Sequence, residues 1–143
     1  KGEKIINYDF KFDKVLLDAP CSCDGIIQKD PARKLTYTKE TIRYCSIRQS
    51  QLIESALNVV KPNGLLVYST CSLAPEENEF VINSIIDKYD ITVESINYDV
   101  VSLLKFGDKI MNKSIKFTKR FYPHIHNTAG FFIAKIRLNN INK

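Results

Sequence analysis

The sequence predicts an α/β fold built on a mostly parallel sheet. Short apolar runs at 12–18 and 65–70 have the character of strands, and the segments 40–60 and 75–89 have the periodicity of helices. Strands that alternate with helices along a chain are typical of parallel α/β sheets. One such domain is expected over residues 1–143.

The first strand and helix have clear local signals. The run Val15-Leu16-Leu17 ends in a Pro-containing turn, which suits a buried strand over 12–18. In 40–60, apolar residues three and four positions apart form one helix face, namely Leu52, Ile53, Ala56, Leu57 and Val60. Pro62-Asn63-Gly64 is expected to end this helix and to turn the chain into the strand at 65–70.

The second helix is expected to begin at Pro75, whose fixed φ suits a first helical position. Acidic residues in its first turn would favour the helix dipole, and these are Glu76, Glu77 and Glu79. Further strands are expected at 91–96 and 131–136. The basic segment 105–120 between them is compatible with a solvated loop and with a flap that faces RNA.

The composition is that of an ordinary globular protein, with 44% hydrophobic and 26% charged residues. A net charge of +5 fits an acidic partner such as nucleic acid. The apolar runs are too short for a membrane span, so no membrane partner is expected. Because the chain begins without a signal-like segment, its four cysteines are expected to be reduced and the protein cytoplasmic.

Two polar motifs follow the two predicted parallel strands. The first, at 18–25, reads Asp-Ala-Pro-Cys-Ser-Cys-Asp-Gly, and the second, at 68–72, reads Tyr-Ser-Thr-Cys-Ser. Ligands of open parallel sheets bind beyond the carboxyl ends of the strands. If the two strands are neighbours, Cys21 and Cys71 should therefore face one crevice.

Paired cysteines at such a place suit the methylation of a cytosine at carbon 5. That carbon is too weak a nucleophile to attack a methyl sulfonium, but a thiolate that adds to carbon 6 makes it enamine-like. Cysteine is intrinsically nucleophilic and partly ionised near neutral pH. An acidic residue near ring nitrogen 3 would stabilise the developing charge, and a second thiol can assist release of the product.

The two motifs resemble those of the Sun-type RNA 5-methylcytosine methyltransferases, in which Asp-Ala-Pro-Cys-Ser-Gly follows one strand and Ser-Thr-Cys-Ser the next. The resemblance implies a Rossmann-like fold with a terminal antiparallel strand. It also implies an enzyme that depends on S-adenosylmethionine and acts on transfer or ribosomal RNA. It implies that Cys71 is the nucleophile and that Cys21 aids product release. Asp18 would contact the target cytosine and, with Pro20, lie near S-adenosylmethionine.

The chain departs from that pattern in two ways. Cys23 stands where the family has glycine after Ser22, and the family's Gly-rich cofactor loop belongs to strands that would precede position 12. The chain is therefore expected to be the C-terminal portion of the catalytic domain. The N-terminal half would be supplied in cis or in trans, and the chain alone would bind the methyl donor weakly.

Basic residues beside the first motif are expected to contact RNA phosphates, and these are Lys29, Arg33 and Arg48. Arg120 and His124, which resemble family landmarks, are further candidates for RNA contact. No metal site is expected, because the cysteines and histidines lack the paired spacing of zinc knuckles.

Other functions fit the motifs less well. Amino-group methyltransferases would place Asn/Asp-Pro-Pro-Tyr/Phe at 18–21, and DNA cytosine-5 enzymes carry their nucleophile in the Pro-Cys motif itself, typically followed by Gln rather than Ser22. A thiol-redox protein would typically show Cys-x-x-Cys, which is not present. The alternative of another class is a non-catalytic RNA-binding module that kept the motifs but lacks its own methyl-donor site.

Overall fold

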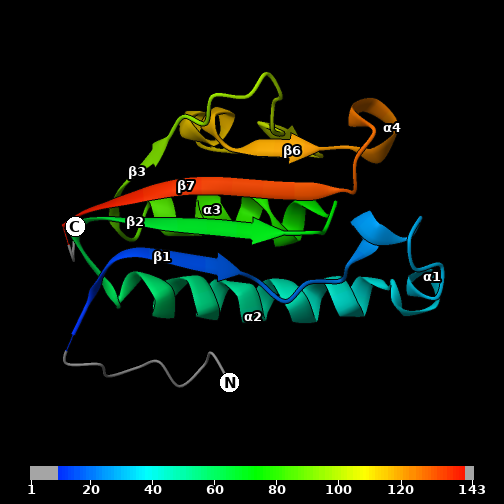
Figure 1. Cartoon of the computed structure of the whole chain (residues 1–143), viewed down its shortest axis with the longest axis horizontal. Coiled ribbons are helices and arrows are strands. Elements are labelled where there is room, and N and C mark those ends of the chain that lie inside the picture. Colours follow the sequence, from blue (N-terminus) through cyan, green and yellow to red (C-terminus); the bar gives the residue numbers. More distant parts are fainter. Residues whose placement is uncertain (1–9, 141–143) are drawn as a thin grey trace.

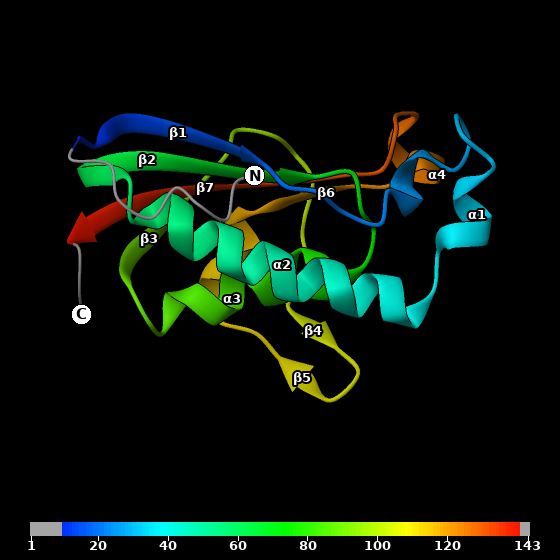
Figure 2. The same cartoon turned by 90° about the horizontal axis from the view of Figure 1, so that it is seen from below.

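The computed structural model describes residues 10–140, which form a mixed sheet with helices packed against one face (Figures 1 and 2). The sheet has five strands, in the order β1 (Phe12–Asp18), β2 (Val60–Thr70), β7 (Phe131–Asn140) and β3 (Asp90–Glu94), with β6 (Lys119–Phe121) also paired to β7. β1 is parallel to β2, and β7 is antiparallel to β2, β3 and β6. Of these five strands, β7 alone runs against the others, which confirms the predicted α/β fold with a late antiparallel strand.

Two helices, α2 (Lys39–Leu57) and α3 (Glu79–Ile86), cover one face of this sheet (Figure 2). The Thr38 hydroxyl accepts a hydrogen bond from the Thr41 N–H and caps α2. The core between these helices and the sheet contains fully buried apolar side chains, including Ile53, Leu66, Tyr68, Ile82, Phe132 and Ile136. The predicted helices and strands are therefore present, and their inward-facing residues form the expected core.

The first strand is less buried than expected. β1 lies at the edge of the sheet, and its residues 12, 14, 16 and 18 are exposed, with Leu16 70% exposed. Parallel sheets are normally covered by helices on both faces. In the described residues 10–140, the main helices lie on one face only, so the alternate side chains of β1 remain uncovered.

The turn expected at Pro62-Asn63-Gly64 lies inside β2 instead. Asn63 adopts a left-handed φ of 60°, and the β1–β2 register jumps from Phe12↔Val60 to Lys14↔Leu65. The three residues therefore form a bulge that extends β2 toward α2 rather than a turn that separates them.

Two other segments also differ from expectation. Pro75 begins a short 3₁₀ helix, η3 (Pro75–Glu77), and α3 begins only at Glu79. Segment 105–120 forms the hairpin β4 (Lys105–Phe106) and β5 (Lys109–Ile110), the 3₁₀ helix η4 (Lys113–Phe117) and the start of β6. Because Met111 and Ile115 are buried, the second half of this segment is packed against the domain and is not a solvated loop.

Three short elements complete the described chain, namely η2 (Asp24–Ile26), α1 (Arg33–Thr36) and α4 (Pro123–His126). η2 and α4 lie beyond the carboxyl ends of β1 and β2 (Figure 1). No helix among residues 10–140 is long and apolar enough to cross a membrane.

Candidate active site

The two cysteine motifs meet at the carboxyl edge of the sheet. β1 and β2 pair in parallel up to Asp18 and Ser69, and both strands end at or just beyond this pair. The thiols of Cys21 and Cys71 then lie 3.2 Å apart. The prediction that these cysteines face one another is confirmed, because their strands are parallel neighbours.

Backbone contacts hold the two loops together. The Gly25 N–H donates to the carbonyl of Cys71 at 3.0 Å, and the Gly130 N–H donates to the carbonyl of Gly25 at 2.8 Å. A Cβ atom on Gly25 would lie 2.4 Å from the Cys71 carbonyl oxygen, so no larger residue fits between these backbones. The carboxylate of Asp24 accepts from the Leu73 N–H at 2.7 Å and adds a further link.

The first loop is also held from beneath by Glu77, which is fully buried. One oxygen of its carboxylate accepts from the Ser22 N–H at 3.0 Å and from the Gln49 side-chain amide at 2.8 Å. The Gln49 amide donates in addition to the Pro20 carbonyl at 2.9 Å. α2 and η3 thus fix the backbone on both sides of Cys21.

Asn78 holds the second loop in the same way. Its side-chain oxygen accepts from the Thr70 hydroxyl at 2.6 Å, and its amide donates to the Ser72 carbonyl at 2.8 Å. Since Asn78 is fully buried, these bonds are shielded from water. Cys71, between Thr70 and Ser72, is therefore attached to a rigid backbone.

Glu79, which follows Glu77 and Asn78 in the acidic segment 76–79, forms a buried ion pair with Arg120. The Arg120 guanidinium also donates to the Leu73 carbonyl at 2.6 Å. Arg120 is only 1% exposed, so the expectation that it contacts RNA is wrong. Its charge is fully engaged inside the protein, and its contribution to the site is to anchor the end of the second loop.

The remaining RNA-contact candidates reach the surface to different degrees. Lys29 and His124 are exposed, and the His124 ring lies 5.6 Å from the Tyr122 ring. Arg33 is partly exposed and forms an ion pair with Asp30 at 3.0 Å, while Arg48 is partly buried on α2. Of the five predicted residues, Lys29 and His124 present the most accessible side chains.

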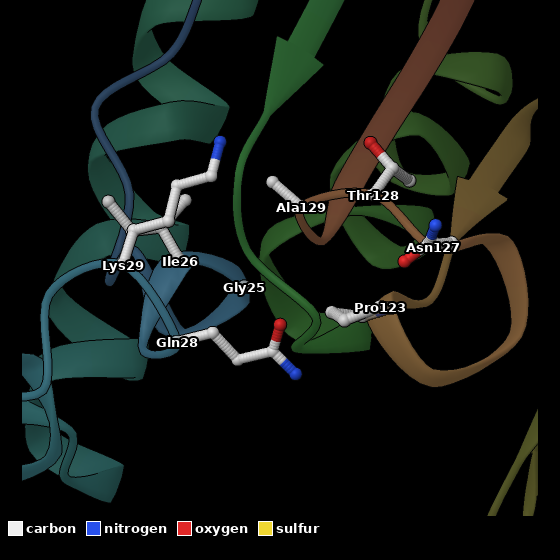
Figure 3. A pocket seen from close by; sticks show the side chains of 8 residues that line it. All are labelled: Gly25, Ile26, Gln28, Lys29, Pro123, Asn127, Thr128 and Ala129. Atoms are coloured by element: carbon white, nitrogen blue, oxygen red, sulfur yellow. The ribbon is translucent and has the colours of Figure 1, made fainter.

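Lys29 stands at the rim of a cavity of about 340 Å³ beside the first motif. Figure 3 shows Lys29 and Gln28 on one side of this cavity and Pro123, Asn127 and Thr128 on the other. Gly25 forms part of its wall, and the Gly25 N–H is the group that donates to the Cys71 carbonyl. A single residue, Gly25, therefore lines the cavity and also bonds to the backbone of Cys71.

The Cys21 thiol is held in its protonated form. The pKa of Cys21 is raised far above its usual value, first by the hydrogen bond with Cys71 and then by burial and by the charge of Cys71. Two thiols at 3.2 Å cannot both ionise without strong repulsion. While Cys71 is a free thiolate, Cys21 therefore stays protonated and can donate a hydrogen bond to it.

Asp18 and Pro20 are both exposed at the edge of β1. The Asp18 carboxylate accepts from the Ser69 hydroxyl at 2.9 Å, which leaves its other oxygen available to a ligand at this edge. The sequence pattern predicts no role for Ser69, and the parallel register that places it opposite Asp18 explains the contact.

A third thiol joins the pair. Cys23 Sγ lies 3.8 Å from Cys21 Sγ, and the ligand atoms of Cys21, Cys23 and Cys71 all lie within 4.8 Å of one another. Cys23 adopts a left-handed conformation with φ of 59°, which glycine accommodates more readily than a residue with a side chain. Cys45 contributes to none of these contacts and lies on α2.

The chain is similar to known RNA methyltransferases. The family model of the 16S rRNA methyltransferase RsmB/F matches residues 2–137. The human 28S rRNA (cytosine(4447)-C(5))-methyltransferase is 41% identical over 132 residues, which are 88% of this chain and 16% of that protein. The tRNA (cytosine(49)-C(5))-methyltransferase of Pyrococcus abyssi is 35% identical over 139 residues, which are 95% of this chain and 45% of that protein.

The fold is also shared with a solved structure. NSun6 from Pyrococcus horikoshii, crystallised with SFG, superimposes with a TM-score of 0.80 at 33% identity, over 98% of this chain and 33% of that one. The chain thus spans less than half the length of these three relatives. Since its motifs, its fold and most of its length match, the chain belongs to the 16S rRNA methyltransferase RsmB/F family.

Proposed function

We propose that the protein containing this chain transfers a methyl group from S-adenosylmethionine to carbon 5 of a cytosine in RNA. The observation that carries the proposal is the 3.2 Å approach of Cys21 and Cys71 at the carboxyl edge of the sheet. A nucleophile and a second thiol within contact distance are what the addition and release steps require. The similarity to RNA cytosine-C5 methyltransferases supports the same reaction.

Cys71 is the proposed nucleophile. The target cytosine leaves its stack and enters the edge of the sheet beside Asp18, where the carboxylate faces the ring. The Cys71 thiolate adds to carbon 6, and carbon 5 becomes nucleophilic as the ring double bond opens. When bound, S-adenosylmethionine would supply an electrophilic methyl group on its sulfonium, which carbon 5 would accept as the S–CH3 bond breaks and the neutral thioether leaves.

Cys21 is proposed to complete the reaction. Once Cys71 is bound to carbon 6 it carries no charge and no longer forms a thiolate hydrogen bond with Cys21. The largest cause of the raised pKa of Cys21 is then removed, so that the pKa falls and Cys21 loses its proton to solvent, which provides the thiolate that acts as the base. The Cys21 thiolate removes the proton from carbon 5, the double bond re-forms, and Cys71 leaves as a thiolate.

Only part of the donor site is proposed to lie within this chain. Asp18 and Pro20 lie at the carboxyl end of β1, where a methyl donor beside the cytosine would contact them. The exposed edge of β1 and its uncovered side chains, such as Leu16, suit the addition of further strands and helices. We therefore propose that residues outside this chain complete the donor site, and that the chain alone binds S-adenosylmethionine weakly in calorimetry.

RNA is proposed to approach over the cavity between η2 and α4. Lys29, which lines this cavity, and the exposed His124, which follows the lining residue Pro123, are the proposed phosphate contacts, and Arg33 and Arg48 are further candidates. Relatives that act on ribosomal and on transfer RNA are similar to this chain, so either RNA is a candidate substrate. A cytoplasmic location stays a prediction.

Covalent trapping tests the proposal. The full-length protein is mixed with RNA and S-adenosylmethionine, and protein–RNA adducts are resolved on a denaturing gel. Cys21→Ala should accumulate an adduct because release fails, and Cys71→Ala and the double variant should form none. Cys45→Ser, which removes a thiol outside the cluster, should behave as the natural protein does.

The outcomes separate the candidate functions. Adduct formation that depends on Cys71 and is enhanced by Cys21→Ala establishes both roles. If no variant forms an adduct but the protein still binds RNA, the catalytic proposal fails, and a non-catalytic RNA-binding module becomes the better account.

A further inference from the structure

The third thiol of the cluster has no part in the proposed methyl transfer. Cys23 Sγ lies 3.8 Å from Cys21 Sγ, and with Cys71 the three sulfur atoms all lie within 4.8 Å of one another. We propose that Cys21, Cys23 and Cys71 form a binding site for a soft divalent metal ion of the Zn²⁺ class.

The sulfur spacing suits such an ion. Three thiolates on a tetrahedral Zn²⁺, with Zn–S bonds of ~2.3 Å, place their sulfur atoms about 3.8 Å apart. The Cys21–Cys23 separation of 3.8 Å matches this value, and the Cys21–Cys71 separation of 3.2 Å requires a small opening. Rotation about the Cα–Cβ bonds can supply that opening, because all three side chains are only partly buried.

The backbone of Cys23 supports a role for its side chain. With φ of 59° and ψ of 27°, Cys23 is in a region that glycine adopts freely and other residues adopt at a cost. In the motif that this segment resembles, glycine stands at this position. Strained non-glycine residues of this kind cluster at ligand sites, where the side chain has a function. Here the strained residue directs a thiol at Cys21.

The ligand set defines the class of ion. Thiolates select soft ions such as Zn²⁺ over Mg²⁺ or Ca²⁺, which prefer oxygen. Three protein ligands leave a fourth position for water or for a ligand from solution. The sequence analysis expects no metal site because zinc knuckles have ligands paired closely in sequence. Here Cys71 lies forty-eight residues beyond Cys23 and reaches the other two thiols from the neighbouring strand.

Metal binding would have a consequence for catalysis. A sulfur atom that is bound to a metal ion cannot add to carbon 6, so the ion would inhibit the enzyme reversibly. This consequence rests on the proposed function, whereas metal binding itself requires only the three thiols.

Cobalt titration tests the site. The full-length protein, kept reduced by a phosphine under anaerobic conditions, is titrated with Co²⁺, and the near-ultraviolet thiolate-to-cobalt absorption is recorded. Zn²⁺ is then added to displace the cobalt. The variant Cys23→Gly places the residue best suited to a left-handed φ at this position, so it should fold at least as well as the natural sequence. Cys45→Ser is the matched control, because Cys45 is a free thiol outside the cluster.

The natural protein and Cys45→Ser should show the same charge-transfer band. Cys23→Gly should lose part of its intensity and bind Co²⁺ at least roughly tenfold more weakly, since even loss of an outer-shell partner has an effect of that size. Equal affinity in Cys23→Gly, or the absence of a band in the natural protein, would overturn the proposal.

A second measurement separates this proposal from the proposed function. Methyl transfer to RNA is measured with and without Zn²⁺, each variant being compared with its own metal-free rate. Zn²⁺ should inhibit the natural protein at lower concentration than it inhibits Cys23→Gly. If cobalt binds through Cys23 but no methyl group is transferred even without metal, the metal site stands and the proposed function fails. If methyl transfer occurs but Zn²⁺ inhibits both proteins equally, the proposed function stands and the inhibitory metal site fails.

Discussion

The carboxylate of Glu77 accepts a hydrogen bond from the backbone N–H of Ser22 at 3.0 Å, across fifty-five residues of sequence. Glu77 lies in η3 after the second motif, whereas Ser22 belongs to the first. One buried side chain therefore connects the loop that carries Cys21 to the segment that follows Cys71. The relative position of the two thiols depends on this connection.

Replacement of Glu77 by alanine should destabilise the protein and loosen the first loop. The Ser22 N–H and the Gln49 amide would lose their acceptor, and an unsatisfied buried group costs about 1–3 kcal/mol. Urea unfolding should show a loss of that size, and trapping in the Cys21→Ala background should show less Cys71 adduct. Glu77→Gln keeps an acceptor oxygen and should lose less. Glu76→Ala, at the neighbouring and more exposed position, should change neither quantity, and an equal effect there would contradict the role of Glu77.

A methyl group at Gly25 should separate the two loops. Its Cβ would lie 2.4 Å from the Cys71 carbonyl oxygen and 2.8 Å from Gly130 Cα, so the backbone must move. Gly25→Ala should therefore reduce adduct formation strongly when both variants are compared in the Cys21→Ala background. Gly107→Ala is the control, because Gly107 has a φ of +57° but a Cβ added there would meet no atom within 4 Å. That control should cost only about 1 kcal/mol through its backbone and leave adduct formation unchanged. Similar activity in both variants would show that the contact at Gly25 is unimportant.

Local patterns predict the secondary structure well because each signal is short-range. The apolar run at 15–17, the helix face around Ile53 and the alternation of elements are all present in the structure. The convergence of Cys21 and Cys71 is also predictable, since it follows from two parallel neighbouring strands. What these patterns cannot show is which face of β1 is covered, because coverage depends on the arrangement of other elements.

The acidic segment 76–79 shows what a local sequence pattern cannot predict. The pattern predicts that Glu77 and Glu79 favour a helix dipole, yet both of them, and Asn78 between them, are fully buried. Each of the three holds a different segment, through Ser22, Thr70 and Arg120 in turn. The partners of the two glutamates lie fifty-five and forty-one residues away, so no local pattern distinguishes an acidic helix start from a set of buried anchors. For the same reason, a segment rich in basic residues does not reveal that Arg120 faces inward.

The buried pair of Arg120 and Glu79 should be essential for stability. Removal of one partner leaves an uncompensated charge in the interior, which costs about 3–5 kcal/mol. Arg120→Met should therefore lower the free energy of unfolding strongly in urea, and Arg120→Met with Glu79→Leu should recover much of the loss. Lys88→Met, which breaks an ion pair with Glu54 at the surface, should have a much smaller effect, because solvent screens this pair. A small effect of Arg120→Met, equal to that of Lys88→Met, would show that the interior pair is not needed.

The effect of Cys71 on the Cys21 thiol should be visible in the reactivity of Cys21. The hydrogen bond with Cys71 is the largest cause of the raised pKa of Cys21, so Cys71→Ala should lower that pKa. At a fixed pH near 8, more Cys21 would then be thiolate, and iodoacetamide should label it faster. The gain should be several-fold rather than the full tenfold per pKa unit, because a thiolate of lower pKa is also a weaker nucleophile, with a Brønsted slope of about 0.4–0.5.

Mass spectrometry of peptides containing Cys21 measures this rate, and Cys45 serves as the internal control. The pKa of Cys45 is raised to about 11, chiefly by burial, with further contributions from the charges of Glu77, Cys21 and Cys23. Labelling of Cys45 should therefore change far less than labelling of Cys21, and in both proteins it should increase as the pH rises toward 11. Cys71→Ala removes the charge and hydrogen bond of Cys71, as bond formation with carbon 6 would. Faster labelling of Cys21 alone would support its activation as a base after the nucleophile has reacted, whereas unchanged labelling would mean that burial alone holds its proton.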